Sequence, residues 1–264
     1  MDNTASCMIE VCDLHKHYKD VHVLRGISTT VAKGEVCAVI GPSGSGKSTF
    51  LRCLNRLEEA SSGEIFINAQ EITDPHLNLN KMRENIGMVF QGFNLFPHMT
   101  ALENVMVGCQ VRRKSQWWMP VFSLPSARRE EEEIREKAKG LIHRLALDSY
   151  MNEKASSLPY GAQRRLEIAR ALATSPDFLL LDEPAAGMNP QESTELMRFI
   201  RHIRDEFDLT ILLIEHDMKV VMGVCQYIWV LEYGQLIAEG DPDAIRNNPR
   251  VIEAYLGEDV SNHA

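Results

Sequence analysis

A glycine-rich loop occupies nine consecutive positions, Gly41-Pro42-Ser43-Gly44-Ser45-Gly46-Lys47-Ser48-Thr49. Before it, the mostly apolar run Glu35 to Ile40 indicates a buried strand. After it, Lys47 to Leu57 is typical of a helix, because four large apolar residues recur there at helical spacing: Phe50, Leu51, Leu54 and Leu57. The loop matches the pattern GxxxxGK followed by Ser or Thr, and it stands between a strand and a helix, as that pattern requires. The stretch predicts a phosphate-binding loop.

Each part of this loop has a use in binding phosphate. Its glycines let the backbone curl, so that successive N–H groups and the start of the helix face an anion. The ammonium of Lys47 can reach the β and γ oxygens of a nucleoside triphosphate, and the hydroxyl of Ser48 can ligate Mg²⁺. The loop therefore predicts a site for a nucleotide and its metal ion.

A second motif follows another expected strand, Phe178 to Leu181, which runs straight into Asp182 and Glu183. Ligands of open parallel sheets bind at the carboxyl ends of the strands. Asp182 is therefore placed to hold Mg²⁺ through water, and Glu183 to polarise an attacking water. With the phosphate loop, this pair predicts hydrolysis of the bound nucleotide.

The order of the remaining patterns predicts an α/β fold. Buried-strand patterns recur at Ile86 to Phe90 and Thr210 to Ile214, and Gln191 to Glu206 is a helical stretch that precedes the second of them. Such alternation favours a largely parallel sheet. The C-terminal patterns are a hairpin at Tyr227 to Glu239, turning at Tyr233-Gly234, and two short helices in Asp241 to Leu256, with breaks at Pro242 and Pro249.

One region departs from this alternation. No strand pattern appears between Phe93 and Ala173, whereas Arg128 to Leu147 carries apolar residues on one helical face: Ile134, Ala138, Leu141 and Leu145. The region therefore predicts a helical insertion into the α/β core. Its section Arg112 to Pro125 predicts an ordered loop or a short helix.

Composition excludes several classes of protein. The chain has 264 residues, 44% hydrophobic and 25% charged, which fits one large domain or a core with an inserted subdomain, and excludes a disordered tail, a collagen or a disulfide scaffold. A net charge of −9 makes nucleic acid an unfavourable partner. The six scattered cysteines predict free thiols in a reducing compartment. No signal-peptide pattern and no run long enough to span a bilayer is present, so other chains would have to hold the protein at a membrane.

Taken together, these motifs resemble those of an ATP-binding-cassette ATPase, the nucleotide-binding subunit of a transporter, over essentially the whole length. The resemblance implies a P-loop, RecA-like α/β core with a mostly parallel sheet, an antiparallel β subdomain and an inserted helical subdomain, and it implies ATP and Mg²⁺ as ligands. By the same resemblance Tyr18 matches the aromatic residue that stacks on adenine. Gln91 matches the glutamine that senses Mg²⁺ and water, and His216 matches the switch histidine that contacts the γ-phosphate. Gly187-Met188-Asn189-Pro190 falls at the family's dimer loop, with Asn189 where aspartate is commoner.

The family's signature, LSGGQ, is altered here to Leu158-Pro159-Tyr160-Gly161-Ala162. In the family this segment acts from the opposite subunit and offers the γ-phosphate a serine hydroxyl and the N–H groups of a helix start. Pro159 has neither hydroxyl nor N–H, whereas Tyr160, Gly161 and the helix start persist. The change is expected to affect turnover more than nucleotide binding.

Two subgroups of the family are recognisable. From about Gly108 onward the chain is similar to ATPases of branched-chain amino acid importers, in PYG of the signature, QRRLEIARAL, DEPAAGMNP, LLIEHDMKVVMG and RNNPRVIEAYLGE. The front is more similar to ATPases of polar amino acid importers, in GPSGSGKSTFLRCLNRLEEASSGEIFIN and MRENIGMVFQGFNLFPHMTALENV, although Gly92 departs from the usual glutamine. This change of resemblance near Gly108 indicates a hybrid chain. Natural divergence, recombination and deliberate design are all open as its origin.

The resemblance implies one domain over 1–264, with the α/β core and β subdomain at 1–92 and 174–240, the helical signature subdomain at 93–173 and C-terminal helices at 241–264. It implies that ATP hydrolysis powers amino-acid import, first of branched-chain and alternatively of polar amino acids. The implied partners are a second ATPase subunit, identical or related, that closes head to tail with this one, transmembrane permease subunits, and indirectly an external amino-acid-binding protein. The implied location is cytoplasmic, on the inner face of the membrane.

Three points leave alternatives open. The permease is expected near Gln91 and Phe93 to Pro97, but this apolar cluster could instead be subdomain core. Pro159, Ala162 and Asn189 favour a module that dimerises on ATP and hydrolyses it poorly. A small-molecule P-loop kinase would also use the phosphate loop, but it leaves the signature segment and His216 unexplained.

Overall fold

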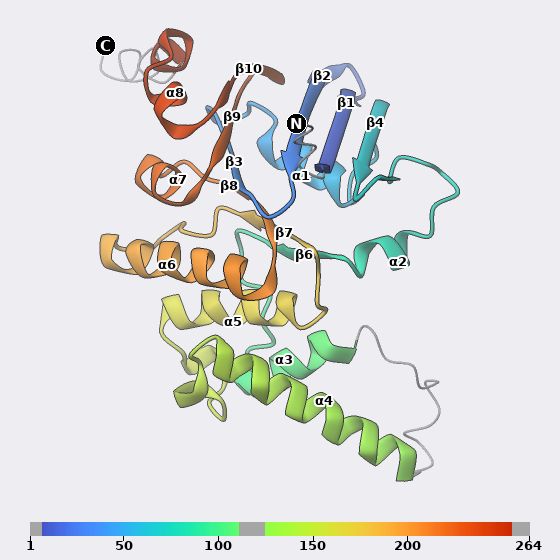
Figure 1. Ribbon diagram of the computed structural model, residues 1–264, viewed down its shortest axis with the longest axis vertical. Coiled ribbons are helices and arrows are strands. Elements are labelled where there is room, and N and C mark those ends of the chain that lie inside the picture. Colours follow the sequence, from blue (N-terminus) through green and yellow to red (C-terminus); the bar gives the residue numbers. More distant parts are fainter. Residues whose placement is uncertain (1–6, 111–124, 255–264) are drawn as a thin grey trace, which may run out of the picture.

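The protein is described by a computed structural model that covers residues 7–110 and 125–254 (Figure 1). The predicted loop or short helix at Arg112 to Pro125 lies outside these residues, except for Pro125. The strands are β1 (Cys7–Tyr18), β2 (Val21–Ala32), β3 (Val36–Ile40), β4 (Ser62–Ile67), β5 (Gln70–Glu71), β6 (Ile86–Val89), β7 (Phe178–Asp182), β8 (Thr210–Ile214), β9 (Tyr227–Glu232) and β10 (Gln235–Gly240). The helices are α1 (Lys47–Leu54), α2 (Leu79–Arg83), α3 (Ala101–Cys109), α4 (Pro125–Arg144), η3 (Asp148–Tyr150), η4 (Ala155–Ser157), α5 (Tyr160–Leu172), α6 (Pro190–Phe207), α7 (Met218–Val224) and α8 (Pro242–Arg246).

Two sheets are present among the described residues. The larger has the order β10-β9-β3-β8-β7-β6; β9 and β10 pair antiparallel, and the other neighbours are parallel. The smaller has the order β2-β1-β4-β5 and is antiparallel throughout. The prediction of an α/β fold with a mostly parallel core sheet and an antiparallel β subdomain is confirmed. Parallel strands β6, β7 and β8 all end at one edge, where the predicted site residues begin.

The core lies on both faces of the larger sheet because successive side chains of a strand point to opposite faces. In β3, Val36, Ala38 and Ile40 join the cluster that includes α3, α4, α5 and α6. Cys37 and Val39 join the cluster that includes α1 and the smaller sheet. Strands buried on both faces read as continuous apolar runs, which is why β3, β7 and β8 were visible in the sequence. All six cysteines are free, as predicted: Cys7, Cys12, Cys37, Cys53, Cys109 and Cys225.

Between β6 and β7 the described chain forms α3, α4, η3, η4 and α5, which lie together below the sheet in Figure 1. Helix α3 begins with a capping box, in which Thr100 and Glu103 satisfy each other's backbone N–H groups. On α4, Ala138 and Leu141 are buried, and Leu145 is buried just beyond the end of the helix. None of the described helices is long and apolar enough to cross a membrane.

Two local predictions were wrong. Helix α1 ends at Leu54 and leaves Leu57 50% exposed, because Arg56 adopts the left-handed conformation (φ 57°) and turns the chain. Pro242 begins α8 after the N-cap Asp241, and Pro249 is the first residue of the next helical segment, so these prolines start helices instead of breaking them.

The hairpin turn between β9 and β10 is hydrogen-bonded both to the smaller sheet and to the phosphate loop. Gly234 accepts a hydrogen bond from the N–H of Arg25 in β2 (2.8 Å) and donates its own N–H to the carbonyl of Ser45 (3.0 Å). Its φ is +79°, and a Cβ there would lie 2.0 Å from the carbonyl oxygen of Val23. Only glycine allows this close approach.

Gly234→Ala is therefore expected to destabilise the protein through both backbone strain and collision. Gly34 is a matched control because its φ is nearly the same (+80°), yet nothing lies within 4 Å of a Cβ placed there. The free energy of unfolding should fall by about 1–3 kcal/mol more for Gly234→Ala than for Gly34→Ala. Denaturant unfolding of the two variants checks this, and equal losses would contradict it.

Candidate functional site

The phosphate loop connects β3 to α1 in a conformation that favours an anion. Gly41 (φ 146°), Gly44 (φ 78°) and Gly46 (φ 99°) all adopt positive φ, which curls the backbone. Gly46 is the N-cap of α1 and has no side chain with which to cap it. The N–H groups of the first helical turn therefore face the loop without a capping oxygen, and an anion can take that place.

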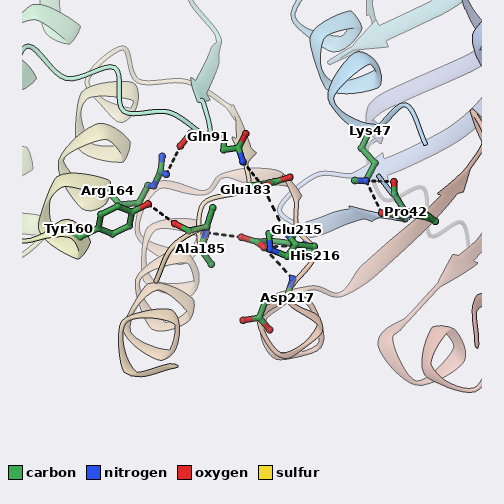
Figure 2. Close-up of polar contacts among 12 residues, drawn as sticks. Pro42, Lys47, Gln91, Tyr160, Arg164, Glu183, Ala185, Glu215, His216 and Asp217 are labelled. Atoms are coloured by element: carbon green, nitrogen blue, oxygen red, sulfur yellow. Dashed lines mark hydrogen bonds and ion pairs between the residues drawn. The ribbon is translucent and has the colours of Figure 1, made fainter. Parts of the chain in front are cut away.

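Lys47 is folded back over the loop. Its ammonium donates hydrogen bonds to the carbonyls of Gly41 (2.7 Å) and Pro42 (2.8 Å). Figure 2 shows Lys47 beside Pro42. Ser48 and Thr49 follow it in the half-buried first turn of α1. A cation, a hydroxyl and uncapped N–H groups thus belong to one short loop and the helix start that follows it, and this donor set fits the phosphates of a nucleotide with its metal ion.

Tyr18 is the last residue of β1, and its side chain is 39% exposed. The ammonium of Lys16 lies 4.6 Å from the centre of its ring. Burial, followed by the carboxylate of Glu58, raises the pKa of Tyr18, and Thr49 opposes this shift. The ring is thus a neighbour of the first turn of α1, where an adenine next to the phosphate site could stack on it.

Asp182 and Glu183 stand at the end of β7. Burial, followed by the neighbouring Glu183 carboxylate, raises the pKa of Asp182, and Lys47 is among the charges that oppose this shift. Glu183 takes a left-handed backbone conformation (φ 48°), and its N–H donates to the carbonyl of Ile214 at the end of β8 (3.0 Å). A non-glycine residue in this conformation stores strain, which is often found at functional positions.

Three of the predicted catalytic side chains converge at the ends of three neighbouring strands (Figure 2). The side-chain amide of Gln91, just after β6, donates to Oε2 of Glu183 (2.8 Å). Nδ1 of His216, just after β8, lies 3.7 Å from the same oxygen. Because β6, β7 and β8 are adjacent and parallel, their carboxyl ends bring these residues together.

Glu215, which directly precedes His216, was missed as a site residue. It is fully buried, and its carboxylate accepts hydrogen bonds from the N–H groups of Ala185 (2.7 Å), His216 (3.2 Å) and Asp217 (3.5 Å). It therefore fastens the chain after Glu183 to the chain that carries His216. The sequence offered one sign of this role, since Glu215 directly extends a buried strand.

Glu215→Gln is expected to change how stability depends on pH. Burial raises the pKa of Glu215 above its ordinary value of 4.5, and the hydrogen bond from Ala185 opposes this shift. The folded protein therefore holds this proton to higher pH than the unfolded chain does. The resulting stabilisation is complete below the unfolded pKa and is lost as the pH rises through the folded pKa.

The thermal midpoint of the wild type minus that of Glu215→Gln should therefore decrease as the pH rises from about 4.5. Glu195→Gln, a change on the exposed face of α6, is the control and should give a constant difference. A constant difference for Glu215→Gln as well would contradict the prediction.

The altered signature starts α5. Pro159 is the N-cap and contributes no side-chain hydrogen bond, and Gly161 lies in the first turn. The hydroxyl of Tyr160 donates to the carbonyl of Ala186 (2.5 Å), and its ring packs edge-on against Phe93 (4.9 Å between centroids). In Figure 2, Tyr160 and Lys47 lie at opposite sides of the site. The phosphate loop and the signature are thus not brought together within one chain.

A P-loop core joined to a helical subdomain defines the class of nucleotide-hydrolysing cassettes. The sequence model of the family described as "ABC transporter" matches residues 24–186, and a second, described as "Branched-chain amino acid ATP-binding cassette transporter", matches residues 235–261. The chain belongs to the ABC transporter family, whose ATP-binding cassettes hydrolyse ATP.

Curated relatives of two kinds are similar to the chain at nearly equal identity. The "High-affinity branched-chain amino acid transport ATP-binding protein BraF" of Pseudomonas aeruginosa is 39% identical, covering 95% of this chain and 98% of its own. The "Arginine transport ATP-binding protein ArtM" of Bacillus subtilis is 40% identical, with coverages of 92% and 95%. Among solved structures, the ATP-binding cassette MJ1267 in its ADP conformation has a TM-score of 0.81 at 29% identity, covering 95% of this chain and 99% of that one.

Proposed function

We propose that this chain is the ATP-hydrolysing subunit that powers the import of branched-chain amino acids through a membrane transporter. The match of residues 235–261 to the branched-chain family carries this proposal, because whole-chain identity does not separate the two kinds of relative. Import of polar amino acids is the second candidate, supported by the relatives named for arginine and glutamine transport.

In the proposed site, each predicted residue has a distinct task. Lys47 and the loop of residues 41–49, through the backbone N–H groups of its residues other than Pro42, bind the phosphates, and Tyr18 stacks on adenine. Ser48, Asp182 and Gln91 would hold Mg²⁺, which when bound would offset charge on the phosphates. No cluster of three or more His, Cys, Asp or Glu side chains suited to a metal exists in 7–110 and 125–254, so phosphate oxygens would complete its shell.

Glu183 is proposed as the general base or water-orienting carboxylate. Its Oε2 is already hydrogen-bonded to Gln91 and close to His216, which would place the three groups around the attacking water and the γ-phosphate. The second half of the site is proposed to come from Pro159, Tyr160 and Gly161 of another ATPase subunit. The positions of Tyr160 and Lys47 at opposite sides of the site in Figure 2 support this arrangement, as does the dimeric cassette MJ0796, which is 30% identical with a TM-score of 0.74.

The proposed permease contact lies beside Gln91. Phe93 and Phe96 are 37% and 39% exposed, whereas Leu95 packs against the core. The apolar cluster is therefore part subdomain core and part exposed surface: Leu95 belongs to the core, and the two phenylalanines are available to a partner. Through that partner the chain would be held at the inner face of the membrane.

The function is tested by uptake in cells that carry the cognate membrane subunits, with and without this chain. The proposal predicts chain-dependent uptake of leucine above that of glutamine or histidine. The reverse preference would establish the polar alternative, and no stimulation by any amino acid would rule out an importer. The external binding protein proposed as an indirect partner would be required in the same assay.

A further inference from the structure

One face of the signature helix holds the segment that carries Gln91. Four residues of α5 at positions i, i+4, i+7 and i+10 lie on this face: Tyr160, Arg164, Glu167 and Arg170. All four contact residues between Phe90 and Phe96 or the aromatic rings within that segment. The contact is therefore a continuous strip, and its centre is a pair of opposite charges.

The guanidinium of Arg164 is fully buried and binds the two residues that directly follow β6. Nη1 donates to the carbonyl of Phe90 (2.8 Å), and Nη2 donates to the carbonyl of Gln91 itself (2.9 Å). The charged group also stacks over the ring of Phe93 at 4.8 Å. Arg164 thus fixes the backbone of Gln91, whose side chain reaches Glu183 (Figure 2).

Glu167, only 3% exposed, completes the arrangement. One carboxylate oxygen accepts from Nη1 of Arg164 (2.8 Å) and the other from the N–H of Asn94 (2.6 Å). The pair therefore grips the segment at residues 90, 91 and 94. Replacing one member of such a buried pair leaves the other charge uncompensated, so the contacts of both side chains to residues 90, 91 and 94 are weakened together.

We propose that Arg164 and Glu167 are positioning residues for hydrolysis: they join residues 90–94 rigidly to the signature helix, so that the amide of Gln91 meets Glu183 only when that helix is in place. The proposal rests on the proposed roles of Gln91 and Glu183. Its consequence is that a partner that displaces the exposed Phe93 or Phe96 moves α5 and Gln91 together. A purely structural role would stabilise the subdomain without acting through Gln91.

A double-mutant cycle on the full chain separates the two roles. Steady-state ATP hydrolysis is measured over a range of Mg·ATP concentrations up to saturation for wild type, Arg164→Met, Gln91→Ala and the double variant. We expect Arg164→Met to lower kcat about tenfold, with KM for ATP within about twofold, and to have almost no further effect once Gln91 is alanine. Arg198→Met, which removes an exposed arginine of α6, should leave the rate unchanged.

A second variant keeps the test decisive if Arg164→Met does not fold. Glu167→Gln preserves size and loses only the charge, and it should show the same dependence on Gln91 with a smaller effect. Multiplicative effects in the double variants would overturn the positioning role while leaving the proposed function intact. A Gln91→Ala variant as active as wild type would overturn both the inference and the proposed role of Gln91.

Discussion

Replacing Lys47 by alanine should weaken ATP binding roughly 100-fold. The variant cannot donate two charge-assisted hydrogen bonds to the phosphate oxygens of ATP, and at ~1.5 kcal/mol each their loss totals ~3 kcal/mol. The Lys47 ammonium already donates to the carbonyls of Gly41 and Pro42, so it is held over the loop before the phosphates arrive. The uncapped first turn of α1 cannot replace it, since partial charges at a helix start amount to about half an elementary charge. Titration calorimetry with Mg·ATP measures the effect.

The matched control is Lys33→Ala. Lys33 is an exposed lysine that pairs with Asp208 at 3.6 Å, and its removal should leave the affinity for ATP unchanged. An unaltered affinity in Lys47→Ala would contradict the assignment of residues 41–49 as the phosphate site.

Replacing Glu183 by glutamine should lower kcat by about 10²–10⁴ while ATP still binds. Glutamine has the size of glutamate and retains an oxygen that can accept the 2.8 Å hydrogen bond from Gln91, so the geometry survives. Its amide cannot accept a proton from the attacking water, and that is the step removed. Single-turnover and steady-state hydrolysis, compared with nucleotide affinity, separate chemistry from binding.

Glu195→Gln on the exposed face of α6 is the control and should hydrolyse ATP as the wild type does. Equal turnover in wild type and Glu183→Gln would instead favour a module that dimerises on ATP and hydrolyses it poorly. Asn189 gives no support to that alternative by itself, because its side chain caps α6 by accepting from the N–H groups of Gln191 and Glu192.

The fold was predictable where one interaction dominates. Strand β8 has the predicted bounds, and β3 and β7 differ by one residue, because strands buried on both faces leave an unbroken apolar run. The end of α1 was not predictable from apolar spacing: Leu57 continues the pattern, but the left-handed turn at Arg56 decides where the helix stops. The same holds for Pro249, whose fixed φ suits a helix start as well as a break.

The site was predictable for residues at strand ends and not for those that hold them. Asp182 and Glu183 follow a visible strand, and Gln91 and His216 came from the family resemblance, after which the sheet order brought them together. Arg164 and Glu167 resemble a solvated i, i+3 ion pair in the sequence, yet both are buried. The sequence signal for their burial is that apolar residues surround them on α5, which leaves that helix little exposed surface.

The most direct test of a shared ATP site is the size of purified Glu183→Gln with and without ATP and Mg²⁺, measured by light scattering after gel filtration. This variant should allow two subunits to close on ATP and should prevent the hydrolysis that reopens them. A shift from monomer to dimer on ATP is the predicted result, and it would mean that Pro159, Tyr160 and Gly161 still complete the site. A monomer in saturating ATP would contradict a site formed by two copies of this chain.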